Sequence, residues 1–330
     1  MVFVEPMKRS IRDVLDQLRS GFVSRARLYD LSGLDRAEAM EVEAAWRDLP
    51  VRTRREVILT LVEVAENDFE ADFGAVFRIA LDDPDATVRE AAVEGLWEDE
   101  DVRLVPRFAA FLREDPAPNV RAAAAASLGR FLLLGELGKI RPLPHQQAYE
   151  ALLAACRSLQ ETLEVRRRAL EALAYSGEEE VAALISEAYR HPEEKMRVSA
   201  VFAMGRSADE RWAEYVLREL LSPNPEMRFE AARACGELGL EEAVATLIEL
   251  VEDVDPEVRE AAIWALGQIG GDEARSTLKR CLRSDNEALR EAARDALREL
   301  EFLHGDLGTL LIPFDFFDED DEEEEEEGFL

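Results

Sequence analysis

The stretch "DPEVREAAIWALG", residues 255–267, decides the fold because six related stretches begin at residues 85, 117, 162, 193, 224 and 286. The interval between two successive copies is 31 residues over most of the array, a period typical of stacked helical repeats. One interval, between the copies at 117 and 162, is 14 residues longer and predicts an inserted loop near residues 131–145. Aligned with one another, the seven copies share an arginine: Arg89, Arg121, Arg166, Arg197, Arg228, Arg259 and Arg290.

Each copy has the pattern of an amphipathic helix. The residue before the arginine is apolar, the third residue after it is alanine and the seventh is Leu, Met or Cys, which places all three on one helical face. A small residue at the third position lets neighbouring helices approach closely. We therefore expect these alanines to be buried: Ala92, Ala124, Ala169, Ala200, Ala231, Ala262 and Ala293.

The residues before each arginine are typical of a helix start. Proline, whose missing N–H costs nothing at the first helical position, occurs at Pro118, Pro225 and Pro256. A second amphipathic segment, such as "EEAVATLIELVED" at 241–253, precedes each copy, so the repeated unit is a pair of antiparallel helices. Side chains that accept hydrogen bonds from free helix amides lie four residues before the arginine, at Asp85, Thr162, Asn224, Asp255 and Asn286.

Glycine recurs just after the apolar positions of several copies. The run "GQIGG" at 267–271 follows a helix and not a strand, so it predicts helix termination and not a phosphate-binding loop. The same interpretation applies to the equivalent residues Gly129, Gly205 and Gly236.

The pattern D-P-x-V-R-x-x-A-x-x-A-L-G resembles the HEAT repeats, in particular the HEAT-like type found in bacteria and in phycobilin lyase subunits, over residues 75–300. The resemblance implies an all-α fold, a right-handed α–α superhelix known as a HEAT-repeat solenoid. We expect an N-terminal helical cap at 1–50, the solenoid at 51–302 and an acidic, disordered tail at 303–330. The family includes scaffolds, transport receptors, chromophore lyases and regulators, so the fold alone does not select a function.

Charge and composition exclude several classes of partner. The formal net charge is −32, and the eleven carboxylates of residues 315–327 leave −21 on the rest of the chain, which repels nucleic-acid phosphates. No stretch reaches the roughly 18 uncharged apolar residues of a membrane helix. The three cysteines Cys156, Cys235 and Cys281 are too few and too far apart for a disulfide framework. We expect a cytoplasmic protein that binds neither nucleic acid nor membrane.

The sequence shows no residue set typical of a catalytic or metal site. His145, His191 and His304 are expected in a loop, a turn and a helix end, without partners at ligand spacing. Cys235 holds a position that is Leu or Met in other copies, so it is expected in the core. We therefore predict no catalytic residue, no cofactor, no metal and no enzymatic activity. The resemblance implies that the repeated arginine joins neighbouring repeats through an acid at the turn; the alternative is a ladder that binds anions.

One set of residues is not explained by the repeat. The first and fifth residues after each arginine lie opposite the core and vary freely. In the HEAT fold the second helix of each pair lines the concave surface, so the resemblance implies an apolar ridge there. Exposed apolar clusters usually mark contact surfaces; alternatively, the curvature of the solenoid or the tail covers them. The ridge consists of Val198, Phe202, Phe229 and Trp264, with Arg167 and Arg233 beside it.

These patterns favour a non-enzymatic scaffold or adaptor that binds a protein partner on the concave face. The tail "PFDFFDEDDEEEEEEGFL", residues 313–330, has the composition of a segment that docks on a basic partner or on the protein's own concave surface, and equally of a solubilising tail. The alternative function is that of a phycobilin-lyase-like or chaperone-like protein acting on a pigment or protein substrate, for which the insertion would build the pocket. Resemblance to the DNA glycosylases of this fold would require a basic stripe, which the charge argues against.

Overall fold

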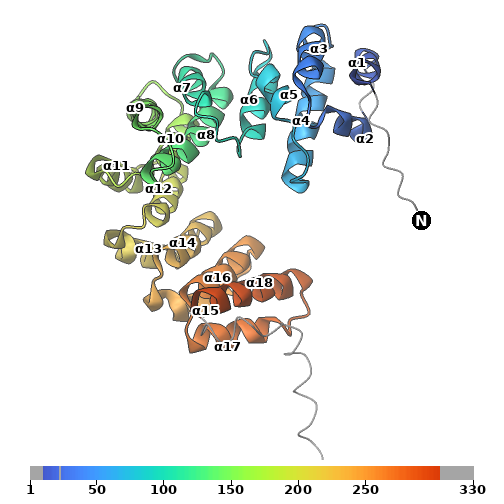
Figure 1. Cartoon of the computed structure of the whole chain (residues 1–330). Coiled ribbons are helices and arrows are strands. Elements are labelled where there is room, and N and C mark those ends of the chain that lie inside the picture. The colour runs from blue at the N-terminus through green and yellow to red at the C-terminus, as the bar shows by residue number, and fades with distance from the viewer. Residues whose placement is uncertain (1–9, 22–23, 305–330) are drawn as a thin grey trace, which may run out of the picture. The chain divides into compact units, whose positions relative to one another are not determined.

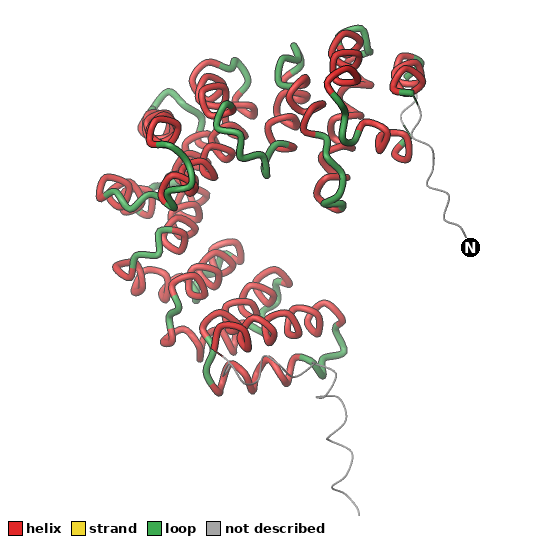
Figure 2. The backbone as a smooth tube through the Cα atoms, in the orientation of Figure 1, coloured by secondary structure: helices red, strands yellow, loops and turns green. Residues whose placement is uncertain are grey.

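The computed structural model describes residues 10–21 and 24–304, and all regular elements within these ranges are helical (Figures 1 and 2). The chain divides into two compact units, with the boundary between Ala203 and Met204 inside one helix. The predicted all-α repeat fold is therefore confirmed. Of the predicted tail, only residues 303 and 304 are described, and they complete the last helix; the rest lies outside the described residues.

The first unit contains the helices before the boundary and most of α12. Its 3₁₀ turn η1 covers Tyr29–Leu31. Its α-helices are α1 (Ile11–Arg19), α2 (Arg25–Leu28), α3 (Arg36–Trp46), α4 (Val51–Asn67), α5 (Gly74–Ala80), α6 (Ala86–Gly95), α7 (Leu104–Glu114), α8 (Pro118–Glu136), α9 (Pro142–Arg157), α10 (Leu163–Leu173), α11 (Glu179–Tyr189) and α12 (Glu194–Arg206).

In the second unit, as in the first, the two helices of each repeat, called the first and the second helix, alternate along the chain. Two 3₁₀ turns, η2 (Glu210–Trp212) and η3 (Glu241–Ala243), lead directly into first helices. The α-helices are α13 (Ala213–Glu219), α14 (Pro225–Leu238), α15 (Val244–Leu250), α16 (Pro256–Ile269), α17 (Asp272–Cys281) and α18 (Glu287–His304).

The seven copies of the repeated sequence form the second helices of the pairs, α6, α8, α10, α12, α14, α16 and α18. Second helices pack side by side, so that α8 contacts α6 and α10 in the first unit, and α16 contacts α14 and α18 in the second. In the first unit, α7 and α9 lie on the outer side of α8 and α10 (Figure 1). The seven alanines at the third position after the repeated arginine are confirmed as core residues, because each has 0% of its surface exposed: Ala92, Ala124, Ala169, Ala200, Ala231, Ala262 and Ala293.

The predicted helix starts are also confirmed. Asp85 accepts a hydrogen bond from the amide of Val88, and Asp255 accepts from the amides of Glu257 and Val258. These bonds satisfy amides that the first helical turn leaves without a partner. Equivalent caps occur at Thr162, Asn224 and Asn286, and proline is the first helical residue at Pro118, Pro225 and Pro256.

The recurring glycine has a different role from the predicted one. Gly267 lies inside α16, which ends only at Gly270, where φ is +77°. A Cβ atom at position 267 would be 2.7 Å from the carbonyl oxygen of Ala296 on α18, so the absence of a side chain is what lets these helices touch. Termination is therefore the wrong explanation for this position. The same close approach to an alanine of the next second helix occurs at Gly129, Gly205 and Gly236.

The extra residues of the long repeat are mostly helical and do not form the expected loop. Helix α8 continues through residues 131–136 and α9 begins at Pro142, so only five residues connect them. The apolar sequence "FLLLGE" extends α8 beyond the usual length, with Phe131, Leu132 and Leu134 buried. His145, expected in the loop, consequently lies in the first turn of α9.

Candidate functional site

The repeated arginines bond to the backbone of the turn before their own helix. In six of them a guanidinium N–H donates to the carbonyl six residues earlier, at 2.8 to 2.9 Å; Arg166 instead donates to the carbonyl of Cys156 at 3.2 Å. The six pairs are Arg89 with Asp83, Arg121 with Asp115, Arg197 with His191, Arg228 with Ser222, Arg259 with Asp253, and Arg290 with Ser284.

Three of these arginines also pair with an acid in the next repeat. Arg89 forms two hydrogen bonds of 2.9 Å with Asp115, and Arg228 forms two of 2.8 Å with Asp253. Arg121 makes the corresponding contact with Glu161. The hydrogen bond from Arg228 lowers the pKa of Asp253. Such two-pronged ion pairs hold consecutive turns together. Because the guanidinium N–H groups of these three arginines donate to protein acceptors, they are not left for an external anion.

Two members of the predicted ridge are buried. Arg167 is 7% exposed and donates to the Ser199 hydroxyl at 2.9 Å and to the Lys195 carbonyl at 3.0 Å, both on α12. Val198, which holds the same position in the next copy, is 2% exposed. Arg167 points toward the following second helix, and neither side chain is open to solvent, so the prediction that these two residues lie on a contact surface is wrong.

The other four residues of the predicted ridge are half-buried, and they do not all belong to the same compact unit. Phe202 belongs to the first unit, whereas Phe229, Arg233 and Trp264 belong to the second. The Arg233 guanidinium lies 3.7 Å from the centre of the Trp264 ring, and burial lowers the pKa of Arg233. The same indole packs on Gly236, where a Cβ atom would come within 2.6 Å of the ring. The Trp264 ring therefore covers the backbone of α14 at Gly236, and the guanidinium of Arg233 covers the ring.

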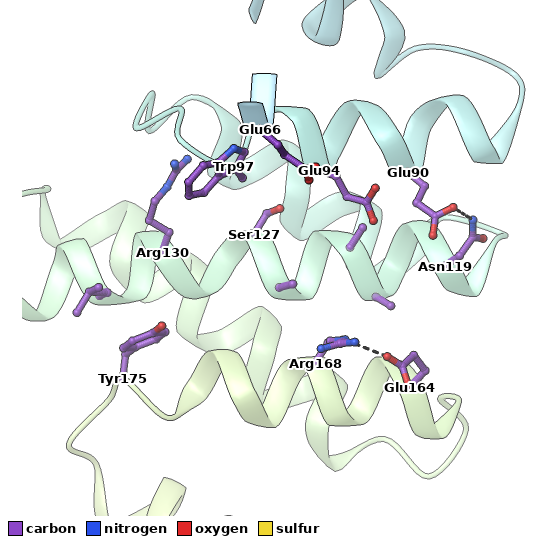
Figure 3. Close-up of a pocket in the computed structure, with 14 residues that line it drawn as sticks. Glu66, Glu90, Glu94, Trp97, Asn119, Ser127, Arg130, Glu164, Arg168 and Tyr175 are labelled. Carbon is purple, nitrogen blue, oxygen red and sulfur yellow. Dashed lines mark hydrogen bonds and ion pairs between the residues drawn. The ribbon is translucent and has the colours of Figure 1, made fainter. Parts of the chain in front are cut away.

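A groove lies instead over the second helices of the first unit (Figure 3). Its volume is about 920 Å³, and its lining comes from α6, α8 and α10, from the turns that follow α6 and α10, and from Glu66 at the end of α4. The floor is α8, where Ala122, Ala123 and Ala126 face the groove. Alanine side chains do not reach across to the neighbouring helices, so the groove stays open along α8.

One side of the groove carries three carboxylates. Figure 3 shows Glu66 of α4 and Glu94 and Glu90 of α6 along this side, with Trp97 at one end. Glu90 accepts a hydrogen bond from the Asn119 side chain at 2.5 Å. Burial, and then the negative charges of Glu90 and Glu66, raise the pKa of Glu94. We call Glu66, Glu90 and Glu94 the acidic wall.

The arginines that line the groove already have acceptors. Arg168, on the side opposite the acidic wall, forms ion pairs of 2.9 Å with both Glu164 and Glu171. Arg130 donates to the carbonyl oxygens of Leu96 and Asp99 in the turn after α6. Arg168 is neutralised by these ion pairs, whereas the carbonyl acceptors leave the charge of Arg130 in place. The three unpaired carboxylates on the other side outnumber this one cation, so the net charge of the groove is negative.

The cysteines and histidines occupy structural positions. Burial raises the pKa of Cys156 to about 11 and that of Cys235 to about 12, so both remain thiols at neutral pH. His145 contacts Glu136 at 3.2 Å, and His304 contacts the carbonyl of Gln268 at 2.8 Å. Within residues 10–21 and 24–304, no group of three or more His, Cys, Asp or Glu side chains is arranged to hold a metal ion.

Sequence reasoning missed the groove because it searched for large apolar side chains at the outward positions. The signal was present in the same positions of the earlier copies, where the pair Ala122 and Ala126 stands next to the pair Glu90 and Glu94. Two outward alanines predict an uncovered helix, and two outward glutamates on the preceding helix predict its charge. Trp97 is the last residue of the copy that begins at Asp85, at the position where several other copies have glycine, and this departure from the repeat was a further signal.

The repeated helix pairs, stacked through their second helices, define an α-solenoid. This chain belongs to the HEAT-repeat family: the model of the family described as HEAT repeats matches residues 75–158 and 213–298. No curated protein matches the sequence. Among the helices of the described residues, none is both long enough and apolar enough to span a membrane.

Solved structures with a similar arrangement of helices include the complex of CpcE and CpcF of phycocyanin lyase from Nostoc sp. PCC7120, at 19% identity and a TM-score of 0.44, covering 60% of this chain and 77% of that chain. Human deoxyhypusine hydroxylase in complex with glycerol is 20% identical with a TM-score of 0.35, covering 79% and 96%. A designed armadillo repeat protein is 20% identical with a TM-score of 0.38, covering 59% and 99%. These similarities concern the fold alone.

Proposed function

We propose that this protein is a non-enzymatic scaffold that binds a protein partner along the second-helix face of its first unit. The observation that carries the proposal is the groove over α8, where three consecutive repeats contribute side chains at positions that the repeat itself does not fix. Residues that do not pack in the core can vary without loss of the fold, so they are the ones that can form a specific binding surface. A solenoid offers such positions at a regular spacing, so contacts add up over successive repeats.

The lining of the groove favours a polypeptide over a small molecule. Pockets for small molecules are mostly apolar, with a few polar groups that orient the ligand. Here six charged side chains surround an alanine floor and one exposed indole. Polar rims around a small apolar centre are typical of protein interfaces, in which Trp and Arg supply a large share of the binding energy.

A photo-crosslinking amino acid at position 126 tests the proposal. Ala126 is exposed on the groove floor, so p-benzoylphenylalanine at this site lies against any segment that occupies the groove. The matched control carries the same amino acid at Gln147, an exposed position on the first helix α9. We expect discrete protein adducts in an extract of the native cell from position 126 and not from position 147. Equal adducts from both positions, or none from position 126, would overturn the proposed function.

A further inference from the structure

The acidic wall has carboxylates that the protein does not neutralise. Glu66 and Glu94 are exposed, and neither makes an ion pair or a hydrogen bond through its carboxylate with any residue in the described part of the chain. Glu90 is bonded to the neutral amide of Asn119, which leaves its charge in place. Three negative charges on one side of a groove repel one another; burial is the main cause of the raised pKa of Glu94, and repulsion from Glu90 and Glu66 raises it further. A cation placed in the groove would relieve it.

Trp97 provides an apolar surface beside these carboxylates. Its side chain is 51% exposed, whereas Trp46 and Trp212 are buried in the core. Figure 3 places Trp97 on the same side of the groove as Glu94, with Arg130 beyond it. An indole face next to carboxylates suits the side chain of lysine or arginine, because the aliphatic stem packs on the ring and the charged head reaches the acids.

We propose that the groove of the first unit binds an extended peptide segment through a lysine or arginine side chain that packs on Trp97 and pairs with Glu94 of the acidic wall. The charge complementarity selects the partner, because Arg168 is already paired, the Arg130 donors are held by backbone carbonyls, and the three carboxylates of the acidic wall outnumber that one cation. The alanine floor gives an extended backbone room to lie along α8. This inference rests on the proposed function and specifies the chemistry of the partner.

The probe is a fluorescein-labelled peptide, Gly-Ser-Ala-Lys-Ala-Lys-Ala-Ser-Gly, and its binding is measured by fluorescence anisotropy in 150 mM salt. At this ionic strength the Debye length is about 8 Å, so the diffuse field of an acidic protein is largely screened. The matched probe carries acetyl-lysine at both positions, which keeps the length of the side chains and removes their charge. We expect the wild-type protein to bind the lysine peptide at least roughly tenfold more tightly than the acetylated one.

Three variants of the protein locate the contact. Glu94→Gln keeps the shape of the side chain and removes its charge, so we expect roughly tenfold weaker binding of the lysine peptide. Trp97→Leu keeps an apolar side chain but removes the ring, and we expect roughly three- to tenfold weaker binding. Glu43→Gln removes the same charge from an exposed site on α3 and should leave binding unchanged. Because the substituted side chains are exposed, far-ultraviolet circular dichroism should show wild-type helicity for all three.

The outcomes separate this inference from the proposed function. If Glu94→Gln and Glu43→Gln weaken binding equally, the peptide is attracted only by the net charge of the protein, and the inference is overturned. Equal affinity for the acetylated peptide, or no binding of either peptide, would also overturn it. If crosslinks still formed from position 126 in any of these cases, the groove would be a protein-binding site for a partner of different chemistry. Loss of both signals would overturn both proposals.

Discussion

Replacing Arg228 by methionine tests whether the repeated arginines hold neighbouring repeats together. The guanidinium forms two hydrogen bonds of 2.8 Å with Asp253, and the side chains are only 13% and 8% exposed. Methionine fills a similar volume but leaves the carboxylate without its partner. Removing one member of a buried pair costs about 3–5 kcal/mol. We expect about 3 kcal/mol here, because Asp253 keeps a hydrogen bond from the amide of Asp255.

Arg12→Met is the matched control for this substitution. Arg12 also contacts its partner through two guanidinium nitrogens, at 3.1 Å each to Glu41, but the two side chains are 77% and 39% exposed. Solvent screens exposed pairs, so we expect no measurable loss of stability. In urea titrations followed by circular dichroism, a loss of about 3 kcal/mol lowers the unfolding midpoint by about 1.5 M for a denaturant slope near 2 kcal/mol/M. Hydrogen exchange should place the loss in α14 and α16.

The effect of Arg228→Met should also depend on pH. The hydrogen bond from Arg228 lowers the pKa of Asp253 in the folded state, which means that folding favours the charged carboxylate. This contribution is fully present above the unfolded-state pKa of about 3.9 and is lost as the pH falls through the lower folded-state value. The wild type and the variant should therefore differ most near pH 7, and the difference should shrink below about pH 4 and disappear below the folded-state pKa of Asp253. A difference that is constant with pH, or no larger than that of Arg12→Met, would refute the ion-pair explanation.

Two further predictions concern packing and thiol chemistry. Gly267→Ala should lower the free energy of unfolding by about 1–2 kcal/mol, although alanine is the better helix former, because the new Cβ would lie 2.7 Å from the backbone of α18. In urea titrations of both variants, Gly177→Ala should be neutral or stabilising by about 0.4–1 kcal/mol, because nothing lies within 4 Å of its Cβ position; equal destabilisation by both would contradict the packing argument. Ellman's reagent should react with fewer than one thiol in the folded protein at pH 8 and with three in urea, since all three cysteines are buried, Cys156, Cys235 and Cys281; fast reaction before unfolding would contradict this.

The sequence predicted the repeat accurately because its determinants are local and periodic. The alanine at the third position after each arginine is buried wherever it occurs, and Asp85 and Asp255 cap their helices as expected. The length of the insertion was also visible, but not its conformation. Spacing shows that residues 131–145 are additional, whereas only the packing of Phe131 and Leu132 in the core makes part of them helical.

The site was harder to predict because exposure depends on the neighbouring repeat. Helical periodicity predicted that Arg167 faces away from its own first helix into solvent, but Ser199 and Lys195 of α12 occupy the space that it faces. Glu90 shows the same geometry, since Asn119 of the following helix bonds to it. A periodicity argument within one helix cannot include contacts with the next helix, so it overestimated the exposure of Arg167 and Val198.

Side-chain size at the fifth position after the arginine determines whether the second-helix face is open or covered. In α8 this residue is Ala126, and the backbone beneath it forms the floor of a groove. In α16 it is Trp264, whose ring lies on Gly236 and beneath the Arg233 guanidinium, so the same face is filled. The two copies share a proline at the first helical position and a buried alanine although they differ at the fifth position, so the repeat requires neither Ala126 nor Trp264. The difference between them is therefore free to specify binding, and the uncovered surface that we propose as the binding site lies on the first unit.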